Sequence, residues 1–100
     1  MWNVYLLNTP KDIEKEEIEK RVLNSFKEDS FFIDNELDVQ LVTRKAIADE
    51  FIVFTKKDYD YYSDAGMLDL KMPNTLSLFD LESNEVIMQS LVTLNKRRTQ

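Results

Sequence analysis

Carboxylates are the side chains with which this sequence could do chemistry, because it contains no His, no Cys and a single Gly. Imidazole bases, thiolate nucleophiles, structural zinc sites and disulfides are therefore excluded. The glycine-rich phosphate-binding motifs cannot be written with Gly66 alone. A pair of carboxylates can perform general acid–base catalysis. Nineteen Asp and Glu in 100 residues, however, make a close pair inevitable and so uninformative.

The acidic residues form two runs that contain no Lys or Arg. The first run has five acids between residues 28 and 38, and the second has four between residues 58 and 69. The members are Glu28, Asp29, Asp34, Glu36 and Asp38 in the first run, and Asp58, Asp60, Asp64 and Asp69 in the second. Ten bases and nineteen acids precede residue 96, so residues 1–95 carry a net charge of −9 and residues 96–100 carry +3.

The spacing of the second run resembles the ladder of carboxylates in a calcium-binding loop. The EF-hand pattern is not met, because Tyr62 stands at a ligand position, Ser63 replaces the turn glycine and Asp69 replaces the last glutamate. We therefore expect neither a metal nor a cofactor. A solvated face that only keeps a small domain soluble is the simplest alternative for both runs.

Three tyrosines lie within the second run. Tyrosine beside carboxylate is typical of protein interfaces, because the ring supplies apolar area while the hydroxyl and the acids bind Arg or Lys. The same rings could instead pack in the core. We predict an acidic, tyrosine-bearing face that occupies a basic site on another protein. The predicted site residues are Asp34, Glu36, Asp38, Asp58, Tyr59, Asp60, Tyr61, Tyr62, Asp64 and Asp69.

A basic site of this kind is typical of proteins that handle nucleic acid, since phosphate contacts require Lys and Arg. The expected partner is thus a nucleic-acid-binding or nuclease protein. The expected function is inhibition, as by an immunity protein, an antitoxin or a phage-type nucleic-acid mimic. On a strand, Glu36 and Asp38 point the same way about 6.8 Å apart, roughly twice the per-strand rise of DNA.

Direct nucleic-acid binding is not expected, because the three cations of 96–98 are opposed by the charge of the rest of the chain. Two other function classes stay open. One is an assembly subunit that self-associates through a C-terminal hairpin, whose apolar strands have few charged residues. The other is a small carboxylate-dependent hydrolase, although we favour a protein that is not an enzyme.

The elements that position these groups follow from hydrophobic spacing. Residues 2–7 are apolar and aromatic and predict a strand. Residues 10–28 predict one long amphipathic helix, with Thr9 as its N-cap and Pro10 in its first position. The apolar stripe of that helix comprises Ile18, Val22 and Phe26, widened by Leu23, with Ile13 lying off the stripe.

The rest of the chain predicts shorter elements. Residues 31–33 fit a short strand or a plug of aromatic core, and residues 36–43 alternate as a strand with an acidic outer face. Residues 44–55 are ambiguous between helix and strand, and we favour a strand over 50–55. Residues 56–65 predict a short helix that is capped by Thr55, ends at Gly66 and points Tyr61, Tyr62 and Ala65 inward. Residues 67–71 predict a strand, and residues 75–81 and 85–94 predict a β-hairpin.

Together these elements predict one small α+β domain over residues 1–95 with a basic tail at 96–100. Its sheet is expected to be mostly antiparallel, with the helix of residues 10–28 packed on one face and a β-hairpin at the C-terminal end. Apolar runs of about four residues are far shorter than the roughly 20 that span a bilayer. With no basic segment at the start, we expect a cytoplasmic protein.

Overall fold

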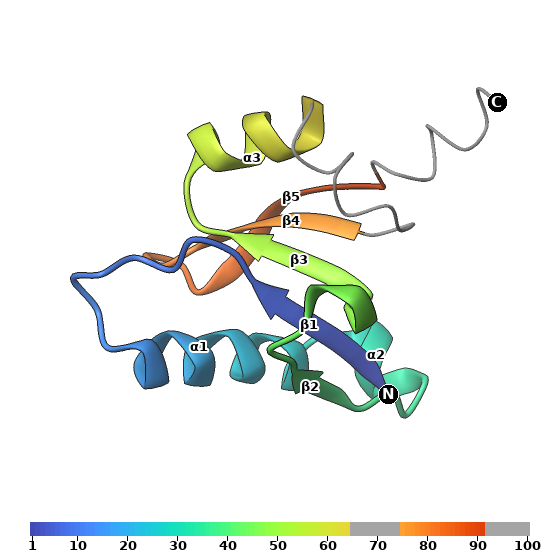
Figure 1. Ribbon diagram of the computed structural model, residues 1–100. Coiled ribbons are helices and arrows are strands. Elements are labelled where there is room, and N and C mark those ends of the chain that lie inside the picture. The colour runs from blue at the N-terminus through green and yellow to red at the C-terminus, as the bar shows by residue number, and fades with distance from the viewer. Residues whose placement is uncertain (65–74, 92–100) are drawn as a thin grey trace, which may run out of the picture.

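A computed structural model describes residues 1–64 and 75–91 of the chain (Figure 1). The described residues form an α+β domain built on a five-stranded mixed sheet. In chain order the elements are β1 (Trp2–Leu6), α1 (Lys15–Lys27), α2 (Ser30–Asp34), β2 (Val39–Leu41), the 3₁₀ turn η1 (Lys45–Ile47), β3 (Glu50–Val53), α3 (Lys56–Asp64), β4 (Thr75–Asp80) and β5 (Glu85–Leu91).

The sheet has the strand order β2-β1-β3-β4-β5, and the prediction of a mostly antiparallel sheet is wrong. The pairs β1–β2, β1–β3 and β3–β4 are parallel, and β4–β5 is antiparallel. Parallel strands need a crossover connection, in which the chain passes over one face of the sheet and returns to the edge where the previous strand began. The connections β1 to β2, β2 to β3 and β3 to β4 are of this kind. Every residue of β3 is buried, as are the four central residues of β4. Burial on both faces is characteristic of parallel strands.

Helices cover both faces of the sheet. The connection from β1 to β2 runs through α1 and α2 on one face, whereas the connection from β3 to β4 contains α3 on the other (Figure 1). These two crossovers move toward opposite edges of the sheet. Because parallel crossovers share one hand, they must then lie on opposite faces. The helix predicted over 10–28 therefore covers one face only, and α3 covers the other.

Each face has its own hydrophobic core. On the α1 side, Ile18 and Val22 of the helix are fully buried against Val4, Ile52 and Phe79 of the sheet. On the α3 side, Tyr59 packs with residues that include Phe51 and Leu76. The alternation of side chains along each strand divides neighbours such as Phe51 and Ile52 between the two cores.

Helix α1 begins five residues later than predicted, and Thr9 and Pro10 belong to the loop before it. Residues 7–14 extend past the end of β1, as the long loop in Figure 1 shows. Only Ile13 of this loop's later part packs against the α1-side core. The predicted stripe of Ile18, Val22 and Phe26 is buried as expected. Helix α1 therefore covers only the part of the predicted helix that contains the apolar stripe.

The other local predictions have mixed outcomes. Residues 31–33 lie in a helix, α2, because the carboxylate of Asp29 accepts the backbone N–H of Phe31 and caps its start at 2.9 Å. The strand favoured within 44–55 is present as β3, and Thr55 caps α3 as predicted. Strands β4 and β5 pair through the turn 81–84, where Asn84 adopts a φ of 58°. The predictions for Ala65, Gly66, 67–71 and the tail lie outside the described residues.

Candidate functional site

The two acidic runs lie on opposite faces of the sheet. The first surrounds α2, on the α1 side, and the described part of the second lies on α3 (Figure 1). They therefore do not form the single acidic, tyrosine-bearing face that the sequence predicts. Asp69 lies outside the described residues. Each run must be considered as a separate surface.

We call the first surface the α2 corner and define it as Met1 with residues 28–38. All five of its carboxylates are on exposed residues. Among residues 1–64 and 75–91, none of the ion pairs involves any of them. Lys27 is the adjacent cation on α1. Residues 28–38 contain no Lys or Arg to offset the five negative charges.

Large apolar side chains are exposed between these carboxylates. Met1 is 66% exposed, Phe31 is 61% and Ile33 is 55%. Phe31 and Ile33 belong to α2, which also supplies Phe32 to the core beneath. The centroid of the Phe32 ring lies 5.0 Å from that of Phe26 and 6.3 Å from that of Trp2. The α2 corner is therefore packed against a cluster of aromatic rings. Exposed apolar groups gathered on a supported surface mark an interaction site.

The predicted row of carboxylates on one strand is wrong. Strand β2 begins at Val39, so Glu36 and Asp38 precede it in the turn after α2. Glu36 has a φ of 51°, a left-handed conformation that favours Gly or Asn. The side chains of Leu37, Val39 and Leu41 alternate inward as predicted. The inward and outward faces were thus predicted correctly, but the strand is too short to align the acids.

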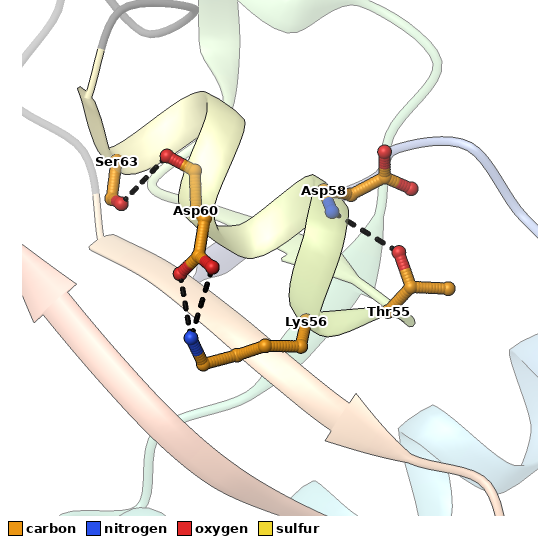
Figure 2. A network of polar contacts seen from close by, with 5 residues as sticks. All are labelled: Thr55, Lys56, Asp58, Asp60 and Ser63. Atoms are coloured by element: carbon orange, nitrogen blue, oxygen red, sulfur yellow. Dashed lines mark hydrogen bonds and ion pairs between the residues drawn. The ribbon is translucent and has the colours of Figure 1, made fainter.

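The α3 surface carries its own cations. The Lys56 ammonium binds both carboxylate oxygens of Asp60 at 2.8 and 2.9 Å (Figure 2). The carboxylate of Asp58 points away from this pair, and its backbone N–H donates to the Thr55 hydroxyl at 3.1 Å (Figure 2). Lys57 is exposed on the same helix. The two lysines leave the described helix with a net charge of only −1, from Asp58, Asp60 and Asp64.

The three tyrosines of α3 have different environments. Tyr59 is buried in the core with 6% exposure, so it cannot serve as a binding residue on the surface. Tyr61 is 59% exposed, which contradicts its predicted inward orientation. Tyr62 is half-buried, and its ring meets that of Tyr61 edge-on at 5.0 Å. The half-buried Tyr62 agrees with its predicted inward orientation. Tyr61 is thus the one tyrosine ring of α3 that is exposed to a partner.

Glu50, at the start of β3, is a buried carboxylate that was not among the predicted site residues, and it is only 2% exposed. Its oxygens accept the Trp2 indole N–H at 2.8 Å and contact the Ser77 hydroxyl at 2.6 Å. The Gln89 amide donates to the same hydroxyl at 3.0 Å. This polar network joins β1, β3, β4 and β5 beneath the α1 side of the sheet. An acid directly before the apolar residues 51–54, inside the strand predicted over 50–55, is the signal that could have identified it.

Burial raises the pKa of the Glu50 carboxyl above its usual range. Hydrogen bonds from Ser77 and Trp2 oppose this shift, and the negative charge of Asp29 adds to it. Glu50 does not line the groove beside α2 or the one between α1 and the β4–β5 turn. Of its hydrogen-bond partners, Trp2 is half-buried and Ser77 is fully buried. This arrangement suits a structural carboxyl that fastens Trp2 below the α2 corner.

Comparison with models of protein families, with curated protein sequences and with solved structures gives no match. In the part of the chain that the structure describes, no helix is both long and apolar enough to cross a bilayer. Within the same residues, no three acidic side chains lie together in an arrangement that could hold a metal ion.

Proposed function

We propose that this protein binds a basic site on a partner protein through the α2 corner and blocks that site. The observation that carries the proposal is the combination of five exposed carboxylates with the exposed side chains of Met1, Phe31 and Ile33. Apolar anchors supply binding energy once they are desolvated, while surrounding charges guide the approach and select the partner. The α3 surface supports this role less well because of its lysines.

The charge of the corner defines the chemistry of the partner. Five carboxylates in eleven residues complement a cluster of Lys and Arg. Proteins that bind nucleic acid carry such clusters, since they must neutralise phosphates. A chain that covers one acts as an inhibitor by steric occlusion, and the partner class we propose is a nucleic-acid-binding or nuclease protein. The roles that we propose for such an inhibitor are those of an immunity protein, an antitoxin or a nucleic-acid mimic.

The proposal is tested by comparing two triple variants in a capture experiment. The first replaces Asp34, Glu36 and Asp38 of the corner by Asn, Gln and Asn. The matched control replaces Asp58, Asp60 and Asp64 of α3 by Asn. Proteins captured from a lysate by each immobilised chain are quantified, and the affinity of each captured partner is then measured in low and high salt.

We expect a partner that is captured by the wild type and the α3 variant but is lost with the corner variant. Its affinity should fall at least tenfold with the corner substitutions and should weaken as salt rises, because the attraction is between exposed charges. The proposal is refuted if all three chains capture the same proteins in the same amounts. Dependence on the α3 residues alone would move the binding site to the other face.

A second candidate function, self-assembly, is favoured by β5. This strand is an edge of the sheet, and its Ile87 and Met88 are 53% and 37% exposed. An edge strand with exposed apolar side chains can pair with a second copy. Sedimentation of the wild type and of an Ile87→Lys variant tests this function. A monomeric wild type at high concentration would exclude it.

A further inference from the structure

A groove opens beside the exposed apolar side chains of the α2 corner. It lies between the C-terminal half of α1, α2 and the segment that leads into β2, with a volume of about 710 Å³. The residues that line it are mainly apolar. The apolar ones include Met1, Leu23, Phe32, Ile33 and Val39.

The apolar lining of this groove is held in place by the core. Phe26 is only 7% exposed, and its ring meets that of Phe32 at 5.0 Å with an edge-on geometry. Val39 pairs with Trp2 in the parallel β1–β2 ladder. The walls are thus parts of regular elements packed against the sheet. A groove with such walls can accept an apolar side chain without first rearranging.

The rim of the groove is mostly acidic. Glu36 and Asp38 are exposed residues in its lining, and Asp34 lies two residues before Glu36, at the end of α2. Lys27 is the one Lys or Arg in the lining, and the carboxylates of Asp34, Glu36 and Asp38 outnumber its charge and that of the N-terminal ammonium of Met1. A cationic side chain next to an apolar one would satisfy both parts of the site, whereas an anionic one would be repelled.

We infer that the partner inserts a large apolar side chain, flanked by Lys or Arg, into this groove. This inference rests on the proposed function and names the segment of the partner that the corner recognises. The apolar side chain packs between Leu23, Phe32 and Val39, while the flanking cations bind Glu36 and Asp38. An apolar anchor seated in a pocket and ringed by charged contacts is the usual composition of an interface hot spot.

Three synthetic peptides test the inference, each capped by acetyl and amide groups. They are Lys-Lys-Phe-Lys-Lys, Lys-Lys-Gly-Lys-Lys and Glu-Glu-Phe-Glu-Glu, and each is titrated into ¹⁵N-labelled full-length protein while amide shifts are followed. Two pairs of variants accompany them. Ile33→Gln alters the groove and is matched by Ile47→Gln on η1, which is 42% exposed. Asp38→Asn alters the rim and is matched by Asp64→Asn on α3.

We expect the first peptide to give saturable shifts around the groove, with at least tenfold weaker binding by the other two. Ile33→Gln and Asp38→Asn should weaken binding severalfold, and their matched controls should not. If the glycine peptide binds equally well, the anchor is wrong although a basic partner remains supported. If the acidic peptide binds equally well, the proposed basic partner is wrong too. Shifts that do not saturate for any peptide overturn the groove inference alone, because the capture experiment tests the function separately.

Discussion

The buried carboxyl of Glu50 leads to a prediction about how stability depends on pH. Replacing it in the variant Glu50→Gln keeps the size and shape of the side chain but removes its negative charge. The amide oxygen can still accept the Trp2 indole N–H, and the amide nitrogen can take the place of an acid proton toward the Ser77 hydroxyl. The variant therefore imitates the protonated form of the glutamic acid at every pH.

The sign of the effect follows from the raised pKa of Glu50 in the folded protein. Since burial favours the neutral form, the folded state holds this proton more tightly than the unfolded state does. In the unfolded chain the pKa of this carboxyl is about 4.3, and below that pH the bound proton contributes its full stabilisation. The stabilisation is lost as the pH rises through the higher pKa that the carboxyl has in the folded protein. One proton corresponds to a slope of at most about 1.4 kcal/mol per pH unit.

Urea unfolding followed by circular dichroism, at a series of pH values from 4 to 9, measures the free energy of unfolding of both proteins. We expect equal values near pH 4 and a growing advantage of Glu50→Gln until the folded pKa is passed. Glu85→Gln removes the same charge from an exposed position at the start of β5 and controls for net charge. A difference between wild type and Glu50→Gln that stays constant with pH, or that grows in favour of the wild type, refutes the reasoning.

The remaining predictions concern α3 and the α2 corner. Thr55→Ala removes the cap of α3 and should lower the free energy of unfolding by about 1 kcal/mol in urea titrations. The control Thr43→Ala, in an exposed loop, should change the free energy of unfolding by less than about 0.5 kcal/mol. Glu36→Asn relieves a left-handed glutamate and should raise stability by about 1 kcal/mol in the same assay, while weakening partner binding in the capture experiment. Lys56→Met breaks the exposed pair with Asp60 and should cost less than about 1 kcal/mol, because solvent screens both charges.

The sequence predicted the buried stripe of α1 and the inward side chains around β2 correctly, because these depend on spacing within a single element. Leu37, Val39 and Leu41 turn inward wherever the strand begins. The pairing of strands depends on the path of the connections instead. Residues 42–49 carry the chain past β1 to its other side, and no alternation of apolar residues specifies that path. The parallel pairing of β1 with β2 and β3, and of β3 with β4, was therefore missed.

The candidate site was predicted in part for the same reason. The acids around α2 were identified, but their setting depends on a helix of five residues that Asp29 caps. On that helix Phe32 packs against the core while Phe31 and Ile33 are exposed, so the apolar part of the site depends on how α2 packs on the sheet. On α3, Lys56 and Lys57 come just before the acidic run in the sequence. The ion pair between Lys56 and Asp60 is a property of the helix, in which residues four apart are neighbours.

The position of Trp2 has an optical consequence. It is the single tryptophan of the chain, and its indole lies between the Glu50 carboxyl and the edge of the Phe32 ring. Its emission therefore responds both to the charge of a buried acid and to the seating of α2 on the sheet. Any event that lifts α2 lets water reach this indole and shifts its emission to the red. The protein thus carries its own fluorophore at the base of the surface that we assign to partner binding, and it needs no added label.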